Sequence, residues 1–122
     1  MFKTTDIPKG LTPLKDINDV TPLNINDKPL IDELAHVLRK YKAEDRFGIT
    51  LLHNHFEMSE SEILLEETNT TTRTQVIRPV SKLSLDETDS IQTSWRLDYG
   101  TAIQICVCQR DKNGYHSSHV KL

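Results

Sequence analysis

Residues 28–42 carry the clearest helical pattern in the chain, and this pattern constrains what the rest of the chain can build. Their apolar side chains recur three and four positions apart, so a helix places them on one side: Leu30, Ile31, Leu34, Val37, Leu38 and Tyr41. Asn26 or Asp27 supplies an N-cap, and Pro29 suits the first turn, where its missing N–H is not needed. An amphipathic helix of this kind covers a flat apolar surface, which predicts a sheet elsewhere in the chain.

The residues after the helix predict that sheet. Turn-forming residues separate runs that alternate apolar and polar side chains or are rich in β-branched and aromatic residues. The predicted strands are Phe47–Phe56, Glu62–Glu67, Thr71–Val80, Ile91–Asp98, Thr101–Arg110 and Tyr115–Leu122. The expected fold class is therefore α+β, with one amphipathic helix packed on a curved, mostly antiparallel sheet of about six strands.

Residues 1–26 are predicted to form an extended N-terminal arm, and residues 27–122 a single α+β domain. Pro8, Pro13 and Pro22 interrupt any helix in the arm, whose apolar residues recur without a helical period. The arm packs on its own domain or docks on a neighbouring subunit, and the pattern fits both. One helix leaves the second sheet face to the arm, to sheet curvature or to a second subunit, so a pocket or a dimer interface is plausible there.

Composition narrows the partners and the compartment. Of 122 residues, 27% are charged and 6% aromatic, and the formal net charge is −3. Because the basic residues are scattered and the aromatic ones few, nucleic acid is not expected as a partner. No apolar stretch reaches the roughly 20 residues of a membrane span, and the first residues lack the apolar core of a secretory signal. Cys106 and Cys108 lie too close on one strand for a disulfide, which predicts a cytoplasmic protein.

The first candidate site is a pair of neighbouring histidines. On a strand, His53 and His55 point to the same side, about 7 Å apart. Two imidazoles can chelate one divalent ion, with Glu57, Glu60 or the distant His116 completing the site. The alternative is that both histidines are half-buried strand residues that hydrogen-bond to the backbone or to Glu57. The sequence leaves both interpretations open.

These residues also resemble the first motif of cupins, in which a glycine precedes His-x-His and a glutamate follows. Gly48, His53, His55 and Glu60 are the matching residues. The resemblance implies that the two histidines and Glu60 bind Zn, Fe, Mn or Ni, with a C-terminal histidine as fourth ligand. The spacing departs from the motif, because only four residues separate Gly48 from His53 and the glycine after the glutamate is missing. The longer segment Arg-Phe-Gly-x-x-Leu-Leu-His-x-His-Phe resembles one found in a set of small fungal and bacterial proteins, a resemblance that implies no particular activity.

A second candidate site lies on the last two predicted strands. The Asn-Gly pair at 113–114 is the strongest hairpin signal in the chain. If Arg110 pairs with Tyr115, Cys106 lies opposite His119. A thiol opposite an imidazole is a candidate nucleophile or a soft zinc ligand. The competing interpretation is that Cys106 fills the core, as buried cysteines commonly do.

These patterns support three hypotheses for function and leave open whether the chain is an enzyme. The leading hypothesis is a small cytosolic accessory or interaction protein, such as a bacterial effector, that acts through an uncovered sheet face. The second is a metal-dependent enzyme or metal-binding module that uses His53 and His55. The third is a thiol-dependent activity at Cys106 with His119.

Overall fold

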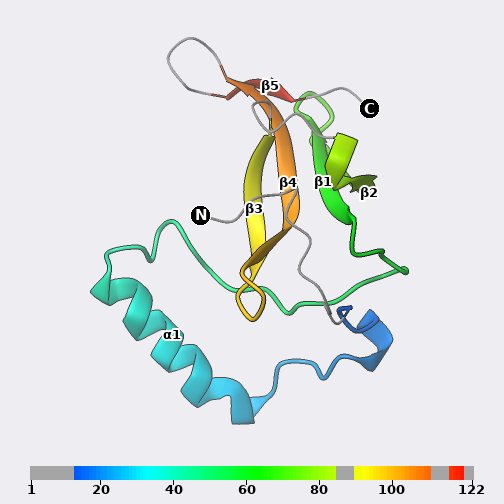
Figure 1. Cartoon of the computed structure of the whole chain (residues 1–122). Helices are drawn as coiled ribbons and strands as arrows, with labels where there is room; N and C mark the ends of the chain where they lie inside the picture. Colours follow the sequence, from blue (N-terminus) through cyan, green and yellow to red (C-terminus); the bar gives the residue numbers. More distant parts are fainter. Residues whose placement is uncertain (1–12, 85–89, 111–115, 120–122) are drawn as a thin grey trace. The chain divides into compact units, whose positions relative to one another are not determined.

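The computed structural model describes residues 13–84, 90–110 and 116–119. It contains one α-helix and a five-stranded sheet, which confirms the predicted α+β class (Figure 1). The chain divides into two compact units. The helical unit is Leu14–Glu57, and the sheet unit includes Met58–Leu122. The predicted packing of the helix on the sheet stays a prediction, because the two elements belong to different units.

The described part of the predicted N-terminal arm is not uniformly extended. It contains two short 3-10 helices, η1 (Ile17–Asp19) and η2 (Ile25–Asp27). The Asp16 carboxylate accepts a hydrogen bond from the Asn18 N–H at 2.9 Å and thereby caps η1. Short polar side chains favour such local turns, and this is the physical reason why the arm departs from an extended course.

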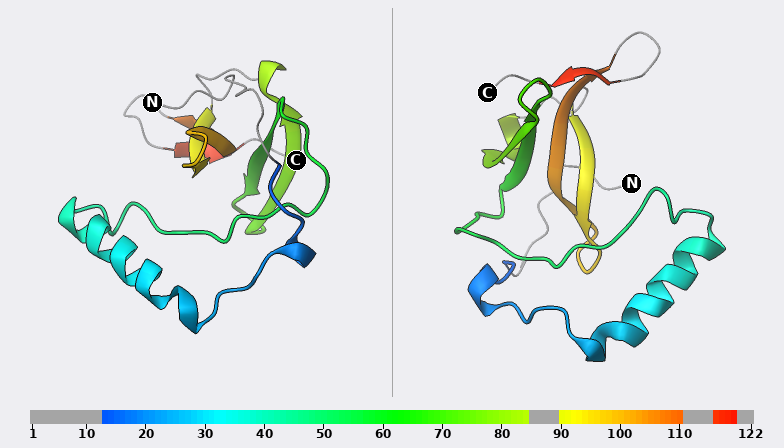
Figure 2. Two further views of the ribbon diagram at one scale, coloured as in Figure 1. Left: turned by 60° about the horizontal axis from the view of Figure 1, so that its bottom comes forward. Right: turned by 180° about the vertical axis from the view of Figure 1, so that it is seen from behind.

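Helix α1 (Lys28–Lys40) begins directly after η2, at the position that the sequence predicts (Figure 2). Asn24 and Asp27 form a capping box around η2: the Asn24 side chain accepts a backbone hydrogen bond at 2.9 Å, and the Asp27 carboxylate accepts one from the Asn24 N–H at 3.0 Å. Pro29 lies in the first turn of α1. These side chains pair N–H groups that have no carbonyl partner at a helix start.

The helix ends in a left-handed turn. Lys42 has a φ of 55°, the Lys42 N–H donates to the Arg39 carbonyl at 3.0 Å, and the Ala43 N–H donates to the Leu38 carbonyl at 2.8 Å. This pair of bonds is a Schellman motif, which usually has glycine at the left-handed position. Because the turn reverses the chain, α1 stops before the predicted end at Lys42.

The sheet unit contains strands β1 (Glu62–Asn69), β2 (Thr74–Ser81), β3 (Ser90–Arg96), β4 (Thr101–Arg110) and β5 (His116–His119), with a 3-10 helix η3 (Lys82–Ser84) after β2. Their order is β2-β1-β4-β3, and β5 pairs with β4 outside this path. The pairs β1–β2, β3–β4 and β4–β5 are antiparallel. The pair β1–β4 is parallel and joins Leu64, Leu65 and Glu66 to Gln104, Ile105 and Cys106.

A small apolar core holds these strands together. Buried Ile63 and Leu65 alternate with half-buried neighbours on β1, as expected of a strand with one covered face. Across the parallel pair, Leu65 meets Ile105. The cluster consists of Ile63, Leu65, Ala102 and Ile105, with Val80 and Trp95 packed against it. The core therefore lies where the two hairpins β1–β2 and β3–β4 meet.

The predicted strand Phe47–Phe56 is wrong. Within the described residues this segment makes one isolated bridge, between Asn54 and Asp16, and joins no sheet. Alternation of apolar residues favours an extended backbone, but a strand also needs a neighbour whose hydrogen-bonding edge is free. Among the described residues the sheet therefore has five strands instead of about six. Three of its four strand pairs are antiparallel, as predicted, and the parallel pair β1–β4 makes the sheet mixed. The predicted curvature of the sheet stays a prediction.

The register of the last hairpin differs from the prediction by two residues at Cys108 and by one at Arg110. The structure pairs Cys108 with His119 and Arg110 with His116, with an irregularity between the two pairs. Cys106 therefore does not lie opposite His119. The connection is longer than a two-residue Asn-Gly turn, since β5 begins only at His116, and loop length sets hairpin register.

Candidate functional site

The backbone between the two candidate histidines is fixed by the start of the helical unit. The Asn54 N–H donates to the Lys15 carbonyl at 2.8 Å, and the Ile17 N–H donates to the Asn54 carbonyl at 2.8 Å. The Asn54 side chain adds a hydrogen bond to the Leu14 carbonyl at 3.4 Å. The backbone N–H and the backbone carbonyl of Asn54 are thus both hydrogen-bonded. These bonds fix the backbone position from which His53 and His55 extend.

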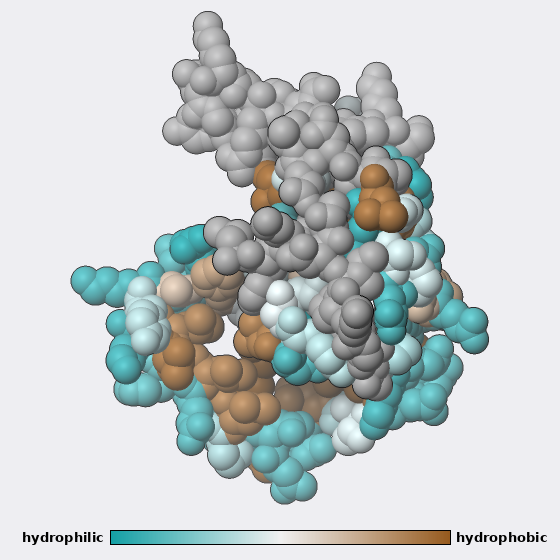
Figure 3. All heavy atoms as spheres, in the orientation of Figure 1, coloured by the Kyte–Doolittle hydropathy of each residue, from teal (hydrophilic) through white to brown (hydrophobic). Residues whose placement is uncertain are grey.

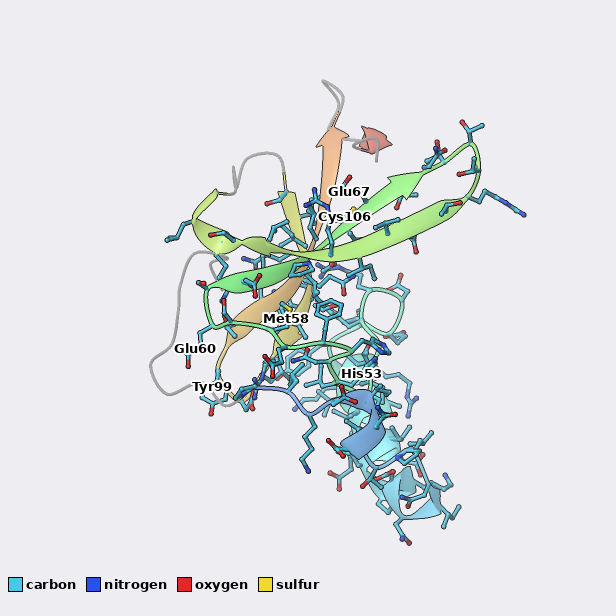
Figure 4. All side chains as sticks on the ribbon, turned by 90° about the vertical axis from the view of Figure 1, so that its right-hand side faces the viewer. His53, Met58, Glu60, Glu67, Tyr99 and Cys106 are labelled. Atoms are coloured by element: carbon cyan, nitrogen blue, oxygen red, sulfur yellow. The ribbon has the colours of Figure 1, made fainter. Side chains whose placement is uncertain are left out.

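His53 and His55 meet through their ring nitrogens. Their Nε2 atoms lie 3.2 Å apart, their ring centroids are 4.8 Å apart, and the ring planes are nearly perpendicular at 89°. His53, labelled in Figure 4, is half-buried, and His55 is exposed. The sequence predicts two imidazoles on one side of a strand; the structure brings them together on a non-strand backbone instead.

The hydrogen bonds of His53 define which of its nitrogens carries the proton. Its Nδ1 lies 2.5 Å from the Leu51 carbonyl oxygen, which only accepts hydrogen bonds. Nδ1 is therefore the donor, and in a neutral ring Nε2 holds the lone pair. His55 then donates its Nε2–H to that lone pair. In this tautomer the lone pair of His53 Nε2 faces the Nε2–H of His55.

No third metal ligand joins this pair in the part of the chain that the structure describes. Those residues contain no group of three or more histidine, cysteine, aspartate or glutamate side chains able to hold an ion. Glu57 and Glu60 are both exposed. The backbone of His116 starts β5, but its side chain lies outside the described residues. The predicted pair is thus brought together without Glu57, whereas Glu60 and His116 belong to the other unit and stay predictions.

Cys106 lies in the sheet unit and is buried, 7% exposed. Figure 4 labels Cys106 on β4. Cys106 pairs with Ile91 of β3 on one side and with Glu66 of β1 on the other. The location favours the interpretation that Cys106 fills the core. The ladder places Cys108, not Cys106, opposite His119; the side chains of Cys108 and His119 lie outside the described residues.

Two ion pairs that the sequence interpretation missed lie in the sheet unit. In the first, Glu67 is 2% exposed and accepts two hydrogen bonds from Arg78, at 3.2 Å from Nε and 2.7 Å from Nη2. The sequence alone did not predict this ion pair, because it does not give the register of β1 against β2. That register sets Arg78 diagonally across from Glu67.

The second pair lies at the end of β3. The buried Arg96 donates to Asp98 from Nε at 3.2 Å and from Nη2 at 2.9 Å, and its guanidinium lies 4.8 Å from the centre of the Tyr99 ring. The hydrogen bond from Arg96 lowers the pKa of Asp98 below its ordinary value. Both ion pairs have a structural explanation and need no ligand.

The helical unit exposes most of its large apolar side chains. On α1 no residue is buried; Leu30 and Val37 are 57% and 46% exposed, and Tyr41, directly after the helix, is 71% exposed. We call these three, with the half-buried Ile31, Leu34 and Leu38, the α1 apolar face. Figure 3 shows apolar residues gathered over this part of the molecule. Further exposed apolar residues of the unit are Leu23, Ile25, Phe47, Ile49, Leu51, Leu52 and Phe56.

Comparison with known proteins finds no family model, no curated protein and no solved structure that matches the chain. The resemblances to cupins and to the small fungal and bacterial proteins therefore stay predictions. The cupin resemblance implied that His53, His55 and Glu60 bind a metal, and residues 47–57 form no strand of the sheet. Among the described residues no helix is both long and apolar enough to cross a membrane.

Proposed function

We propose that this chain is a small cytoplasmic interaction protein whose α1 apolar face binds a second copy of the chain. One observation supports the proposal above all: a helix of thirteen residues contains no buried residue, although its apolar residues gather in one arc. An exposed apolar surface of this kind marks an interaction site in a soluble protein. The sequence predicted an uncovered sheet face as the interaction surface, and this proposal uses the α1 apolar face instead.

The sheet unit offers a poorer surface. Its large exposed apolar side chains, among the residues described, are Val76, Ile77, Leu83 and Leu97. They come from β2, from η3 and from the residue after β3, so they belong to three different elements. The helical unit contributes ten such side chains within 44 residues. Because exposed apolar side chains are more frequent in the helical unit, α1 and its neighbours are the better candidate for an interaction surface.

The charges on α1 suit an antiparallel partner of the same sequence. In its first half Asp32 is paired with Lys28 at 2.7 Å, which leaves Glu33 as the acidic residue without an ion pair among the described residues. Arg39 and Lys40 lie in its last turn. The basic residues of the last turn complement the helix dipole. In a two-fold pair of antiparallel helices, Glu33 of each chain lies opposite the basic last turn of the other. A second copy is therefore the partner that the charge pattern favours.

The free energy gained by burying the α1 apolar face indicates how much of the helical unit the dimer interface must include. Complete burial of a large apolar side chain is worth about 1.5–3 kcal/mol, so burying the exposed half of Leu30, Val37 and Tyr41 yields about 1 kcal/mol for each. Six such side chains in a dimer give about 6 kcal/mol, at the low end of the cost of association. A dimer of useful strength therefore also needs neighbours such as Phe47 and Phe56.

Sedimentation of the full chain over a range of concentrations tests the proposal. We expect a monomer–dimer equilibrium that Val37→Glu abolishes and that His36→Glu leaves intact, because His36 is an exposed residue outside the apolar arc. A wild-type chain that stays monomeric at all concentrations would refute self-association.

A charge exchange tests the antiparallel geometry itself. Glu33→Lys and Lys40→Glu should each weaken the dimer, because each sets like charges opposite one another in a symmetric pair. A mixture of the two variants should form a heterodimer, since positions 33 and 40 then carry opposite charges across both of the symmetry-related contacts. A mixture that associates no better than either variant alone contradicts the antiparallel arrangement.

A further inference from the structure

We propose that His53 and His55 bind one zinc ion through their Nε2 atoms. This site is separate from the α1 apolar face and does not depend on self-association. Three features of the described structure support it: the distance between the two nitrogens, the proton position on His53, and the fixed backbone between the rings.

The distance between the nitrogens fits two ligands of one ion. Zinc binds imidazole nitrogen at about 2.0–2.1 Å with tetrahedral angles, which puts two such nitrogens about 3.3 Å apart. The Nε2 atoms of His53 and His55 are 3.2 Å apart without any ion. The nearly perpendicular ring planes show that the rings do not stack. Zinc binding therefore requires ring rotation but little change in separation.

The proton position on His53 is the one that a zinc ligand needs. Histidine ligands commonly donate their other ring N–H to a carbonyl, which fixes the ring and leaves the ligating nitrogen unprotonated. His53 does this through Nδ1 and the Leu51 carbonyl. His55 must move its proton from Nε2 to Nδ1, through solvent, before it ligates. A neutral pair then binds zinc without net release of a proton.

The backbone supports the pair from a separate segment. Asn54 is tied to Lys15 and Ile17 through both of its backbone polar groups, at 2.8 Å each. A flexible His-x-His sequence would lose backbone conformational entropy on chelation, whereas here the backbone between the two residues is already held by hydrogen bonds. With two protein ligands in the described region and an exposed His55, water fills the remaining coordination positions. The site is thus open, unlike a four-ligand structural zinc site.

Calorimetric titration of the full chain with zinc, after purification without a metal column, tests the proposal. We expect one zinc ion per chain and at least tenfold weaker binding in His53→Ala and in His55→Ala. His36→Ala is the matched control, because His36 is a single exposed histidine on α1, and it should bind zinc as the wild type does. Equal affinity of the wild type and both site variants, or no binding by the wild type, would overturn the proposal.

Nitrogen-15 NMR of the histidine rings tests the site in the unmodified chain, so loss of folding in a variant cannot obscure the result. The metal-free protein should show His53 protonated at Nδ1, and zinc should shift the Nε2 signals of His53 and His55 selectively. A His53 ring protonated at Nε2, or zinc shifts equal at His36, counts against the site. Self-association measured in the presence of a chelator should be unchanged, which separates this proposal from the proposed function.

Discussion

The buried carboxylate of Glu67 on β1 accepts two hydrogen bonds from the guanidinium of Arg78 on β2, at 3.2 Å and 2.7 Å. The Glu67 side chain is almost completely covered, whereas that of Arg78 is 54% exposed. Glu67 continues the series of buried positions that Ile63 and Leu65 begin in β1, so a charge stands where the strand pattern would place an apolar residue. The two hydrogen bonds from Arg78 offset the cost of burying that charge.

Loss of Arg78 should therefore destabilise the sheet unit. We expect Arg78→Met to lower the free energy of unfolding by about 2 kcal/mol, because Glu67 stays buried without its charged partner. Urea denaturation measures the change. The double variant Glu67→Leu, Arg78→Met should regain most of the loss, since it removes the buried charge as well. A double variant as unstable as Arg78→Met would show that Arg78 acts through something other than Glu67.

Glycine at position 42 should stabilise α1. Lys42 has a left-handed backbone, which costs a non-glycine residue about 1 kcal/mol, and its φ of 55° is one that glycine adopts freely. We expect Lys42→Gly to raise the free energy of unfolding by about 0.5–1 kcal/mol, measured by far-ultraviolet circular dichroism on heating. The control Lys40→Gly, inside the helix, should lower stability by a similar amount. If both substitutions destabilise alike, the left-handed turn is not present in solution.

Replacing the Thr101 hydroxyl with a methyl group should raise the free energy of unfolding. Oγ1 of Thr101 is buried and has no hydrogen-bond partner among the described residues. Thr101→Val keeps the shape and removes the cost of burying that hydroxyl, so we expect a gain of about 1 kcal/mol. Thr93 provides the comparison, since its hydroxyl donates to the Gln104 carbonyl at 3.3 Å. Thr93→Val should be neutral or slightly destabilising; a loss of stability in Thr101→Val would indicate a hidden partner for Oγ1.

Acid should weaken the end of β3 through Asp98. Arg96 lowers the pKa of Asp98 below its ordinary value of 3.8, so the folded state favours the charged carboxylate. The stabilisation is complete above pH 3.8 and is lost as the pH falls through the lower folded-state pKa. The stability of the wild type should therefore fall more steeply than that of Asp98→Asn below this pH, measured by denaturant midpoints. Parallel pH profiles would contradict the Arg96–Asp98 interaction.

The sequence predicted those helices and strands whose bounds depend on interactions between residues close together in the chain. The start of α1 was predicted from Asn26 or Asp27 as N-cap and Pro29 in the first turn. Asp27 is the N-cap residue and Pro29 lies in the first turn, although the Asp27 carboxylate bonds to the Asn24 N–H rather than to an N–H of α1. Strand β4 was predicted with the bounds Thr101–Arg110 that the structure shows. In both cases the side chains that define the element are neighbours in sequence.

Non-local relationships could not be predicted in this way. The parallel pairing of β1 with β4 joins residues about forty positions apart, and alternation within a strand carries no information on which edge it meets. Residues 47–56 have a strand-like pattern but no sheet partner in the described chain. The meeting of His53 and His55 was predicted from strand geometry, yet it arises from hydrogen bonds between Asn54 and residues 14–17.

The strand order β2-β1-β4-β3 has a consequence for folding. Each hairpin closes over a short stretch of chain and can form early. The parallel pairing of β1 with β4, here called the β1–β4 seam, contains three residue pairs and closes over a much longer loop. Assembly of the seam should therefore limit the rate of folding. Any fluctuation that reopens it uncovers two strand edges together with Leu65 and Ile105, and exposed edges of this kind pair readily with other molecules. Aggregation of this protein should begin at that seam.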